Sequence, residues 1–290
     1  MQDAINKAAA LVEAHAYIRS FAGRVVVVKV GGSIMDTPEA LKALLQDVCF
    51  MHSVGMRPIL VHGGGKGITA AMEQAGLEAQ FVQGRRYTDD RTLAIAEHVL
   101  VNDINAGIVE MIGEAGHAAM GLHSLSSCVV FGKRLFLDGE EGRKIDIGSV
   151  GEVTQVNGDL LHAITQAGTI PVIAPIARDP AGGKLNINAD SVAGHVAAAI
   201  KAEKIVLVSD THGIRKSANP DDLARHLNRG EIDALVSSGV ISEGMLPKVE
   251  ASLTALHAGV TKAHIIDGRI PHALLLEVYT DAGVGTEIVL

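Results

Sequence analysis

A lysine and two glycines follow a run of valines in the segment RVVVVKVGGSIMD, residues 24–36. Residues 25–28 have the unbroken β-branched pattern of a strand that is covered on both faces of a parallel sheet. Lys29 would then lie near the carboxyl end of that strand, where the ligands of open α/β sheets bind. A cation beside the bare amides of Gly31 and Gly32 suits an anion, and a phosphate in particular. The alternative is a surface lysine in an ordinary turn after a strand.

Three consecutive glycines end the next predicted strand, in HGGGKG at residues 62–67. Backbone amides without a Cβ beside them can form a nest for a carboxylate or phosphate oxygen. A plain flexible loop is the alternative, although three glycines cost more backbone entropy than a turn requires. The segment is not a P-loop, because Gly67 follows Lys66 where that motif has Ser or Thr. No convincing G-x-G-x-x-G fingerprint with an acidic ribose ligand is found in the sequence, which argues against nicotinamide binding.

Charged residues near predicted turns and helix starts extend this pattern. Arg85 and Arg86 lie in the turn GRRYTD, and a guanidinium can hold a planar carboxylate bidentately, although most arginines are solvated surface residues. Asp190 in NINAD stands at a predicted helix start, where a plain N-cap is the alternative to a functional role. Lys248 in EGMLPKVEAS also lies near a helix start, where a cation opposes the macrodipole. Such local costs cluster at functional sites.

The composition of the 290-residue chain limits the fold classes and the kinds of partner that we expect. Hydrophobic residues make up 48% and aromatic residues 3%, which fits stacked parallel strands and helices better than an all-β sandwich. The net charge of -8 and the lack of a basic block argue against a nucleic-acid surface. Cys49 and Cys128 have no disulfide-framework or metal-ligand spacing, which favours a reducing cytoplasm. No apolar run approaches the ~20 residues of a membrane span, so we expect a soluble, cytoplasmic protein.

The elements that must position these residues alternate between strands and helices. Strands are predicted at residues 25–30, 57–62, 169–177, 204–210, 262–267 and 283–290, with hairpins between residues 117 and 157. Helices are predicted at residues 3–20, 38–54, 68–77, 160–168, 244–259 and 271–281, from Arg91 onward with a break near Asn102, from Asp190 onward, and as short pieces within 221–241. This order predicts a three-layer α/β/α sandwich with a mainly parallel central sheet, in which two lobes meet around residue 186.

Seven motifs in a fixed order carry a resemblance to a known family. They are KVGG, VHGGG, GRRYTD, NINAD, SDTHGI, GMLPKVEASL and AHIIDGRIPHALLLEVYTDAGVGTEIV. Together they resemble the acetylglutamate kinases of the amino-acid kinase family, from about Ala14 to the end of the chain. The resemblance implies three parts: an N-terminal helix for oligomerisation and regulation (1–22), a lobe for acetylglutamate binding and dimerisation (23–185), and an ATP-binding lobe (186–290).

The activity implied by this resemblance is phosphoryl transfer from ATP, with Mg²⁺ on its phosphates, to the γ-carboxylate of N-acetyl-L-glutamate in arginine biosynthesis. Lys29 and Lys248 would flank the transferring phosphoryl group, and Asp190 would orient both lysines. The acceptor is already a carboxylate, so no general base is required, which fits the lack of a catalytic His or Ser constellation.

The resemblance also implies the binding residues. Gly31, Gly32 and Gly64 would offer backbone amides to phosphate oxygens, and Arg86 would hold the α-carboxylate of the acceptor. The implied acetylglutamate site consists of Gly64, Gly65, Arg86, Asn186 and Asn188. The implied nucleotide site consists of Gly31, Gly32, Asp210, Thr211, Gly213, Ile214 and Arg215.

The N-terminal segment with AYIRSF resembles the extension of arginine-inhibited members, where it interlaces dimers into hexameric rings. We therefore expect a homo-oligomer, either a dimer or a hexamer, with arginine as an inhibitor. The residues implied to bind arginine are Tyr17, His264, Glu277 and Gly283, and ordinary packing is the alternative for each.

The chain departs from the family pattern at three places. It has KVGGSIM where the family often has KYGGNAM, and HGGGKGI where the family has HGGGPQI, so that Lys66 adds a charge beside the substrate loop. GLHSLSSCV at residues 121–129 replaces the common GLSGKDG. One alternative is therefore a kinase for a related acid such as N-acetyl-aminoadipate, because one methylene is discriminated by only ~1–3 kcal/mol. Another is a catalytically weak arginine-sensing protein, which would have no need of two phosphate-facing lysines.

Overall fold

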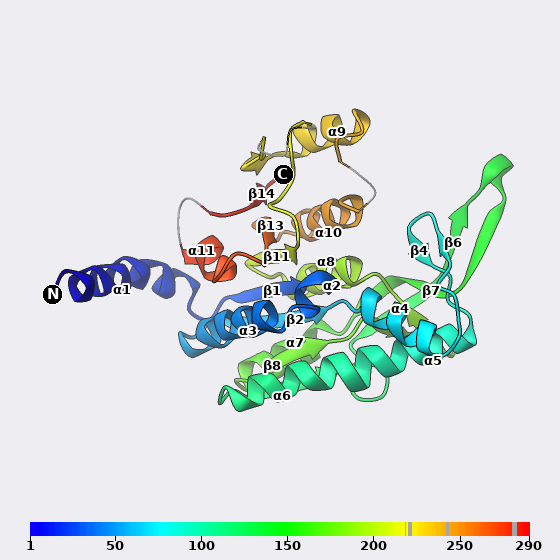
Figure 1. Cartoon of the computed structure of the whole chain (residues 1–290), viewed down its shortest axis with the longest axis horizontal. Helices are drawn as coiled ribbons and strands as arrows, with labels where there is room; N and C mark the ends of the chain where they lie inside the picture. The colour runs from blue at the N-terminus through cyan, green and yellow to red at the C-terminus, as the bar shows by residue number, and fades with distance from the viewer. Residues whose placement is uncertain (218, 220–221, 242–243, 280–282) are drawn as a thin grey trace.

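An eight-stranded sheet forms the centre of the molecule in the computed structural model, which describes residues 1–217, 219, 222–241, 244–279 and 283–290 (Figure 1). In spatial order the strands are β12 (His226–Leu227), β14 (Thr286–Ile288), β13 (Lys262–Asp267), β11 (Lys204–Ser209), β1 (Val25–Val30), β2 (Arg57–His62), β8 (Ile170–Ile173) and β5 (Ala119–Leu122). β13 and β14 are antiparallel, and the other neighbours are parallel. The predicted, mainly parallel sheet is confirmed.

Helices cover both faces of this sheet. On one face lie α7 (Gly158–Gln166), α8 (Ala189–Ile200) and α10 (Leu246–His257), and on the other lie α2 (Gly32–Met35), α3 (Pro38–Ser53), α6 (Ala106–Glu114) and α11 (Ala273–Tyr279). Along β1, Val25 and Val27 pack under α8, whereas Val26 and Val28 pack under α3. The strand is therefore buried on both faces, as its valine run predicts, and the three-layer sandwich is confirmed.

Parallel pairing brings the carboxyl ends of four strands to one edge. Lys29 on β1 is in register with Val61 on β2 and with Leu207 on β11. β11 continues in register with β13, where Val208 lies opposite Ile266. The segments that follow these strands therefore meet at the same edge, which is where a doubly wound sheet binds ligands.

A smaller four-stranded sheet closes on itself beside the central one. Its strands are β6 (Val130–Asp138), β7 (Lys144–Val156), β9 (Ile176–Arg178) and β10 (Lys184–Asn186), and a short helical turn, η2 (Glu140–Gly142), joins β6 to β7. β6 and β7 form the long hairpin that projects from the body in Figure 1. The predicted single strand 169–177 is wrong, because Pro175 has no N–H for a ladder and separates β8 of the central sheet from β9 of the small one.

The helix predicted from Arg91 does not break near Asn102. α5 (Asp90–His98) passes into the π-helical segment η1 (Val99–Asn105) and then into α6 without leaving the helical conformation. π-helical turns inside helices are rare and occur frequently at functional sites. The sequence pattern located the irregularity correctly but mistook its kind.

The N-terminal helix α1 (Gln2–Phe21) extends away from the body in Figure 1, and Tyr17, Ile18 and Phe21 near its carboxyl end pack on the core. The remaining elements are α4 (Gly65–Gln74), β3 (Phe81–Val82), β4 (Arg85–Arg86) and α9 (Arg229–Ser237). The helix predicted at 271–281 corresponds to α11, and positions 280 and 281 lie outside the described residues, as do 221, 242 and 243 of other predicted helices and motifs. Among the described residues, no helix is both long and apolar enough to cross a membrane.

Candidate active site

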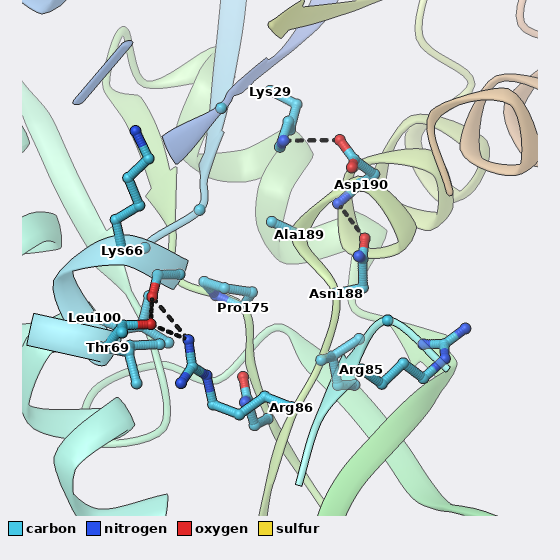
Figure 2. A pocket seen from close by; sticks show the side chains of 18 of the residues that line it. Lys29, Lys66, Thr69, Arg85, Arg86, Leu100, Pro175, Asn188, Ala189 and Asp190 are labelled. Atoms are coloured by element: carbon cyan, nitrogen blue, oxygen red, sulfur yellow. Dashed lines mark hydrogen bonds and ion pairs between the residues drawn. The ribbon is translucent and has the colours of Figure 1, made fainter. Parts of the chain in front are cut away.

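One buried carboxylate joins two lysines from distant parts of the chain. The Nζ atom of Lys29, near the end of β1, lies 2.8 Å from Oδ1 of Asp190, and each of these side chains is 7% exposed. The Nζ atom of Lys248, in the first turn of α10, lies 3.6 Å from Oδ2 of the same carboxylate. Figure 2 shows Lys29 and Asp190 facing each other at one wall of a cavity. The structure therefore brings together the three residues that the sequence predicts to be catalytic.

Asn188, and not Asp190, is the N-cap of α8. Its side-chain oxygen accepts hydrogen bonds from the backbone N–H groups of Asp190 at 2.8 Å and Ser191 at 3.2 Å. The alternative of a plain N-cap role for Asp190 is therefore wrong, and its carboxylate is available to the lysines. Burial raises the pKa of Asp190, but the charges of Lys29 and Lys248 outweigh that effect and hold the pKa below its ordinary value.

A close approach of α8 and α10 brings Lys248 to Asp190. A Cβ at Gly194 of α8 would lie 2.7 Å from the backbone oxygen of Ala251 in α10, so that only glycine permits this packing. Lys248 also donates to the backbone oxygen of Gly244 at 3.3 Å. This bond offsets part of the electrostatic cost of a cation at the positive end of a helix.

Gly31 allows β1 and β11 to converge beside Lys29. A Cβ at Gly31 would lie 2.8 Å from the backbone oxygen of Val208, and the Gly31 N–H donates to that same oxygen at 3.0 Å. The amide that the sequence assigns to a phosphate is thus engaged in this structure. Gly31 instead lines the cavity next to Lys29 without a side chain, whereas Gly32 forms the first residue of α2.

A cavity of about 520 Å³ opens at this edge of the sheet. Its walls come from the ends of β1, β2 and β11, the starts of α4, α8 and α10, and the β3–β4 hairpin. Among its lining residues are the predicted Lys29, Gly31, Gly64, Gly65, Arg86, Asn186, Asn188, Asp190, Asp210 and Lys248. Such a volume accommodates a small ligand.

The glycine loop after β2 forms the floor of this cavity. A Cβ at Gly64 would lie 2.5 Å from Cδ2 of Leu100 and 2.9 Å from Cδ1 of Ile104, both in η1. The π-helical turn therefore packs directly against the loop. At Gly65, by contrast, a Cβ would meet nothing within 4 Å, so this position leaves its side open to the cavity.

Arg86 is held at the far end of the cavity. Its Nη2 atom donates to the backbone oxygen of Gly65 at 2.9 Å and to Oγ1 of Thr69 at 2.7 Å, and its guanidinium lies 4.8 Å from the ring centroid of Phe81. Partial burial lowers the pKa of Arg86, which nevertheless stays charged. In Figure 2 the side chain of Arg85 points the other way, away from Thr69. The structure thus separates the two arginines of the GRRYTD turn.

Two threonines that the sequence analysis missed support this end of the site. Oγ1 of Thr69 accepts a hydrogen bond from Arg86. Oγ1 of Thr88 lies 3.4 Å from Nδ2, the side-chain nitrogen, of Asn186. Thr69 lies one helical turn after Gly65 and donates to its carbonyl oxygen at 3.0 Å. That i, i+4 spacing after the glycines is the sequence feature from which Thr69 could have been predicted. Thr88 and Asn186 lie far apart in the sequence, so no local pattern predicts their contact.

A buried imidazole supports the glycine loop from behind. His62 is completely buried, with Nδ1 2.9 Å from the backbone oxygen of Gly63 and Nε2 3.1 Å from the amide nitrogen of Asn105. Asn105 also donates to the backbone oxygen of Val172 at 2.9 Å. Burial lowers the pKa of His62 to about 4, so the ring is neutral at physiological pH. The sequence analysis included His62 in the glycine motif but assigned a role to neither residue.

The segment predicted to border the nucleotide follows β11 at the same edge. The side chain of Thr286 in β14 anchors it, since the N–H of Ile214 donates to its Oγ1 at 2.8 Å. Gly213 has φ of +127°, and a Cβ there would lie 2.5 Å from Oγ1 of Thr286, so glycine is required. Asp210 and Arg215 are exposed, whereas Thr211 is partly buried.

A second cavity of about 500 Å³ brings together the four residues predicted to bind arginine, which are Tyr17, His264, Glu277 and Gly283. Nδ1 of His264 lies 2.6 Å from Oε1 of Glu277, and the other carboxylate oxygen accepts from the N–H groups of Val284 at 2.7 Å and Gly285 at 3.1 Å. Burial raises the pKa of Glu277, but the hydrogen bonds from these groups reverse the effect and lower it. Nε2 of His264 is buried and lacks a hydrogen-bond partner among the described residues.

The departures from the family pattern have definite places. Lys66 pairs with Asp36 at 2.8 Å on the exposed rim of the first cavity. In the loop 121–129, Ser124 donates to Oε1 of Glu97, whose other oxygen accepts from Lys184 at 2.7 Å. This loop is therefore tied to α5 and β10, outside the residues that line the cavity.

A solved structure shares this fold. The N-acetylglutamate synthase from Neisseria gonorrhoeae, complexed with coenzyme A and N-acetyl-glutamate, matches with a TM-score of 0.85 at 22% identity, over 98% of this chain and 63% of the synthase chain. At that identity the likeness concerns the fold alone. The sandwich defines an α/β protein with two lysines and one carboxylate at the carboxyl edge of its sheet, which is where such sheets bind ligands.

The chain belongs to the amino-acid kinase family, whose model matches residues 24–267. It is 45% identical to the acetylglutamate kinase of Symbiobacterium thermophilum over 290 residues, which is 99% of each chain. It is 46% identical to the acetylglutamate kinase of Moorella thermoacetica over 290 residues, which is 98% of each chain. The family resemblance drawn from the seven motifs is confirmed.

Proposed function

We propose that the protein is an acetylglutamate kinase that transfers the γ-phosphoryl group of ATP to the γ-carboxylate of N-acetyl-L-glutamate, a step of arginine biosynthesis. The observation that carries this proposal is the pair of lysines on the buried carboxylate of Asp190, at one wall of a cavity with a fixed arginine at its far end. Near-identical length and 45% identity to a curated acetylglutamate kinase support the same substrate.

The acceptor binds with its two carboxylates toward opposite ends of the cavity. Arg86 takes the α-carboxylate, because its guanidinium is already oriented by Gly65 and Thr69. The open side of Gly65 makes room for the backbone of the substrate, and Asn186 and Asn188 bind its acetylamino group. The side-chain oxygen of Asn188 is used in the helix cap, so its amide nitrogen makes the contact.

Transfer then requires positioning and charge neutralisation. An oxygen of the γ-carboxylate attacks the γ-phosphorus, the bond from that phosphorus to the β,γ-bridging oxygen breaks, and ADP leaves with the electron pair. Lys29 and Lys248 stabilise the charge on the phosphoryl oxygens, while the ionised Asp190 holds both ammonium groups in place. No proton moves in this step, since acceptor and product are both anions.

The nucleotide lies along the carboxyl ends of β1, β11 and β13. Gly31 lets the backbone approach the phosphates beside Lys29 without a side chain, Gly32 at the start of α2 offers a backbone amide, and the segment Asp210–Arg215 borders the nucleoside. Mg²⁺ enters as part of the nucleotide substrate. Its preference for oxygen ligands suits the exposed carboxylate of Asp210 at the cavity wall.

Three further assignments belong to this proposal. The chain functions in the cytoplasm as a homo-oligomer, either a dimer or a hexamer, in which residues 1–22 contact another subunit. Residues 23–185 form the lobe for acetylglutamate binding and dimerisation, residues 186–290 form the lobe for ATP binding, and residues at the ends of β1 and β10 contribute to both sites where the lobes meet. Arginine binds in the second cavity, whose lining includes the carboxylates of Glu277 and Glu287 and the ammonium group of Lys204, and inhibits the enzyme.

A substrate panel tests the proposed activity. ADP release with Mg²⁺ and ATP should depend on N-acetyl-L-glutamate and should fall sharply in Lys29→Met. Turnover with N-acetyl-aminoadipate but not with N-acetyl-L-glutamate would reject the proposed substrate and favour the related kinase.

Arginine regulation is tested separately, by adding arginine to the same assay and to a thermal unfolding experiment. Inhibition with a raised unfolding temperature supports the second site. Tight arginine binding by a protein without any phosphoryl transfer would favour the sensing alternative, and the absence of any arginine effect would reject the regulatory site.

A further inference from the structure

Lys66 is a cation that the HGGGPQI pattern of the family does not contain. It lies in the first turn of α4, directly after Gly65, and lines the same cavity as Lys29. Its side chain is 69% exposed, unlike the buried Lys29, so it can change its conformation without disturbing the core.

The surroundings of Lys66 place its charge at the end of the cavity where the phosphates of the nucleotide are proposed to lie. Its Nζ atom lies 2.8 Å from Oδ2 of Asp36, the residue that follows α2, and the charge of Asp210 after β11 attracts it as well. Both carboxylates lie on the segments that follow β1 and β11 in the chain, where the nucleotide is proposed to lie. Figure 2 shows Lys66 extending toward the end of the cavity that contains Lys29, away from Arg86. It is therefore poorly placed for the acceptor's α-carboxylate.

The present partner of Lys66 is easily exchanged. Asp36 is 41% exposed, and ion pairs between exposed side chains contribute little to stability because water and salt screen them. A phosphate chain carries more negative charge than one carboxylate and accepts several hydrogen bonds, so it competes well for a flexible lysine.

The fixed charges of the site leave a role for such a cation. Lys29 and Lys248 share the carboxylate of Asp190, so their combined charge is partly neutralised before any nucleotide binds. We propose that Lys66 is a third lysine for the phosphate donor, which leaves Asp36 and binds the phosphate chain of the nucleotide. This assignment rests on the proposed function for the presence of a nucleotide, but it does not depend on the identity of the acceptor.

Nucleotide titration without acceptor tests the assignment directly. We expect Lys66→Gln to weaken the affinity for MgADP, and for a nonhydrolysable MgATP analogue, by about fivefold to tenfold, the effect of one charge-assisted contact. Asp36→Asn should strengthen the affinity, because it releases Lys66 and removes a competing negative charge. The salt dependence of nucleotide binding should become shallower in Lys66→Gln.

A matched control is Lys133→Gln. Lys133 pairs with Glu152 at 3.0 Å, with side chains 66% and 47% exposed, on the hairpin and outside the lining of the cavity. This variant should bind nucleotide like the wild type. In steady-state kinetics, Lys66→Gln should raise KM for ATP by the same factor as it weakens binding, while kcat and KM for the acceptor change by less than about twofold.

Unchanged nucleotide affinity in Lys66→Gln overturns the assignment, and so does a rise confined to KM for the acceptor. The outcomes separate this inference from the proposed function. A wild-type protein that binds nucleotide but phosphorylates another acid contradicts the acceptor assignment and leaves Lys66 to be judged by the titration. A protein that binds no nucleotide contradicts both.

Discussion

The Nζ atom of Lys29 lies 2.8 Å from Oδ1 of Asp190, in a place where both side chains are almost completely buried. Lys248 approaches the other oxygen of the same carboxylate at 3.6 Å. One buried and one partly buried cation over a single buried anion leave a net positive charge, which is costly unless a ligand completes the balance. The arrangement therefore favours an anionic group, and the transferring phosphoryl is the group that the family implies.

Loss of either lysine should affect the chemical step more than binding. We expect Lys29→Met to lower kcat by about 10²- to 10³-fold, as for the loss of one preorganised charge-stabilising donor, with a much smaller change in KM for acetylglutamate. The fold should survive, because Asp190 retains Lys248 as a partner. A coupled ADP-release assay measures both constants, and Lys133→Gln is again a suitable control. A value of kcat within about twofold of the wild type would contradict the role of Lys29.

The sequence predicted the residues of this charge cluster but not the contacts that hold it. Lys29 was recognisable because a valine run fixes the strand and its carboxyl end, and local pattern is sufficient for that. Asn188 as the cap of α8 has a local signal too, but NINAD offers two candidate caps, and only the partner of Asp190 distinguishes them. The approach of α10 through Gly194 depends on packing between distant segments. The contact of His62 with Asn105 likewise joins residues that no local pattern connects.

The two glycines of the substrate loop should respond differently to alanine. Gly64→Ala places a Cβ 2.5 Å from Leu100, and overpacking of this kind costs about 1–3 kcal/mol of unfolding free energy. Gly65→Ala meets no neighbour within 4 Å, so we expect unchanged or slightly higher stability but a KM for acetylglutamate raised about tenfold, because the new methyl group enters the cavity. Urea unfolding and steady-state kinetics measure the two effects. Equal loss of stability in both variants would contradict the open side of Gly65.

Replacement of Arg86 by lysine keeps the positive charge at this position but removes the planar guanidinium group. The guanidinium contacts Gly65 and Thr69 while facing the cavity, and an ammonium group cannot reproduce both sets of bonds. We expect Arg86→Lys to raise KM for acetylglutamate by about 10- to 100-fold, with KM for ATP nearly unchanged. An effect on ATP alone would show that the cavity binds its ligands in the opposite orientation.

Folding stability should fall in mild acid because of His62. Its pKa in the folded protein is about 4, below the ordinary 6.5, so the unfolded chain takes up a proton first as the pH falls. Its contribution is complete above pH 6.5 and decreases between pH 6.5 and 4. From pH 7.5 to 5, this single residue should account for about 2 kcal/mol of lost unfolding free energy.

The variant His62→Gln isolates that contribution. Glutamine does not titrate, so its unfolding free energy, measured in urea at both pH values, should decrease by about 2 kcal/mol less than that of the wild type. The variant will also be less stable at pH 7.5, but the difference between the two pH values is the relevant quantity. Parallel pH dependence in the two proteins would mean that His62 becomes protonated in the folded state as readily as in the unfolded chain.

In the proposed reaction, two ammonium groups bracket the transferred phosphoryl group. A crystal structure with MgADP, aluminium fluoride and N-acetyl-L-glutamate tests it most directly. We predict that the Nζ atoms of Lys29 and Lys248 both lie within about 3 Å of fluoride ligands. The γ-carboxylate should lie in line with ADP, on the opposite side of the aluminium ion. A complex in which the fluoride group lies away from both lysines, or in which only one of them reaches it, would mean that the two lysines do not act together on the phosphoryl group.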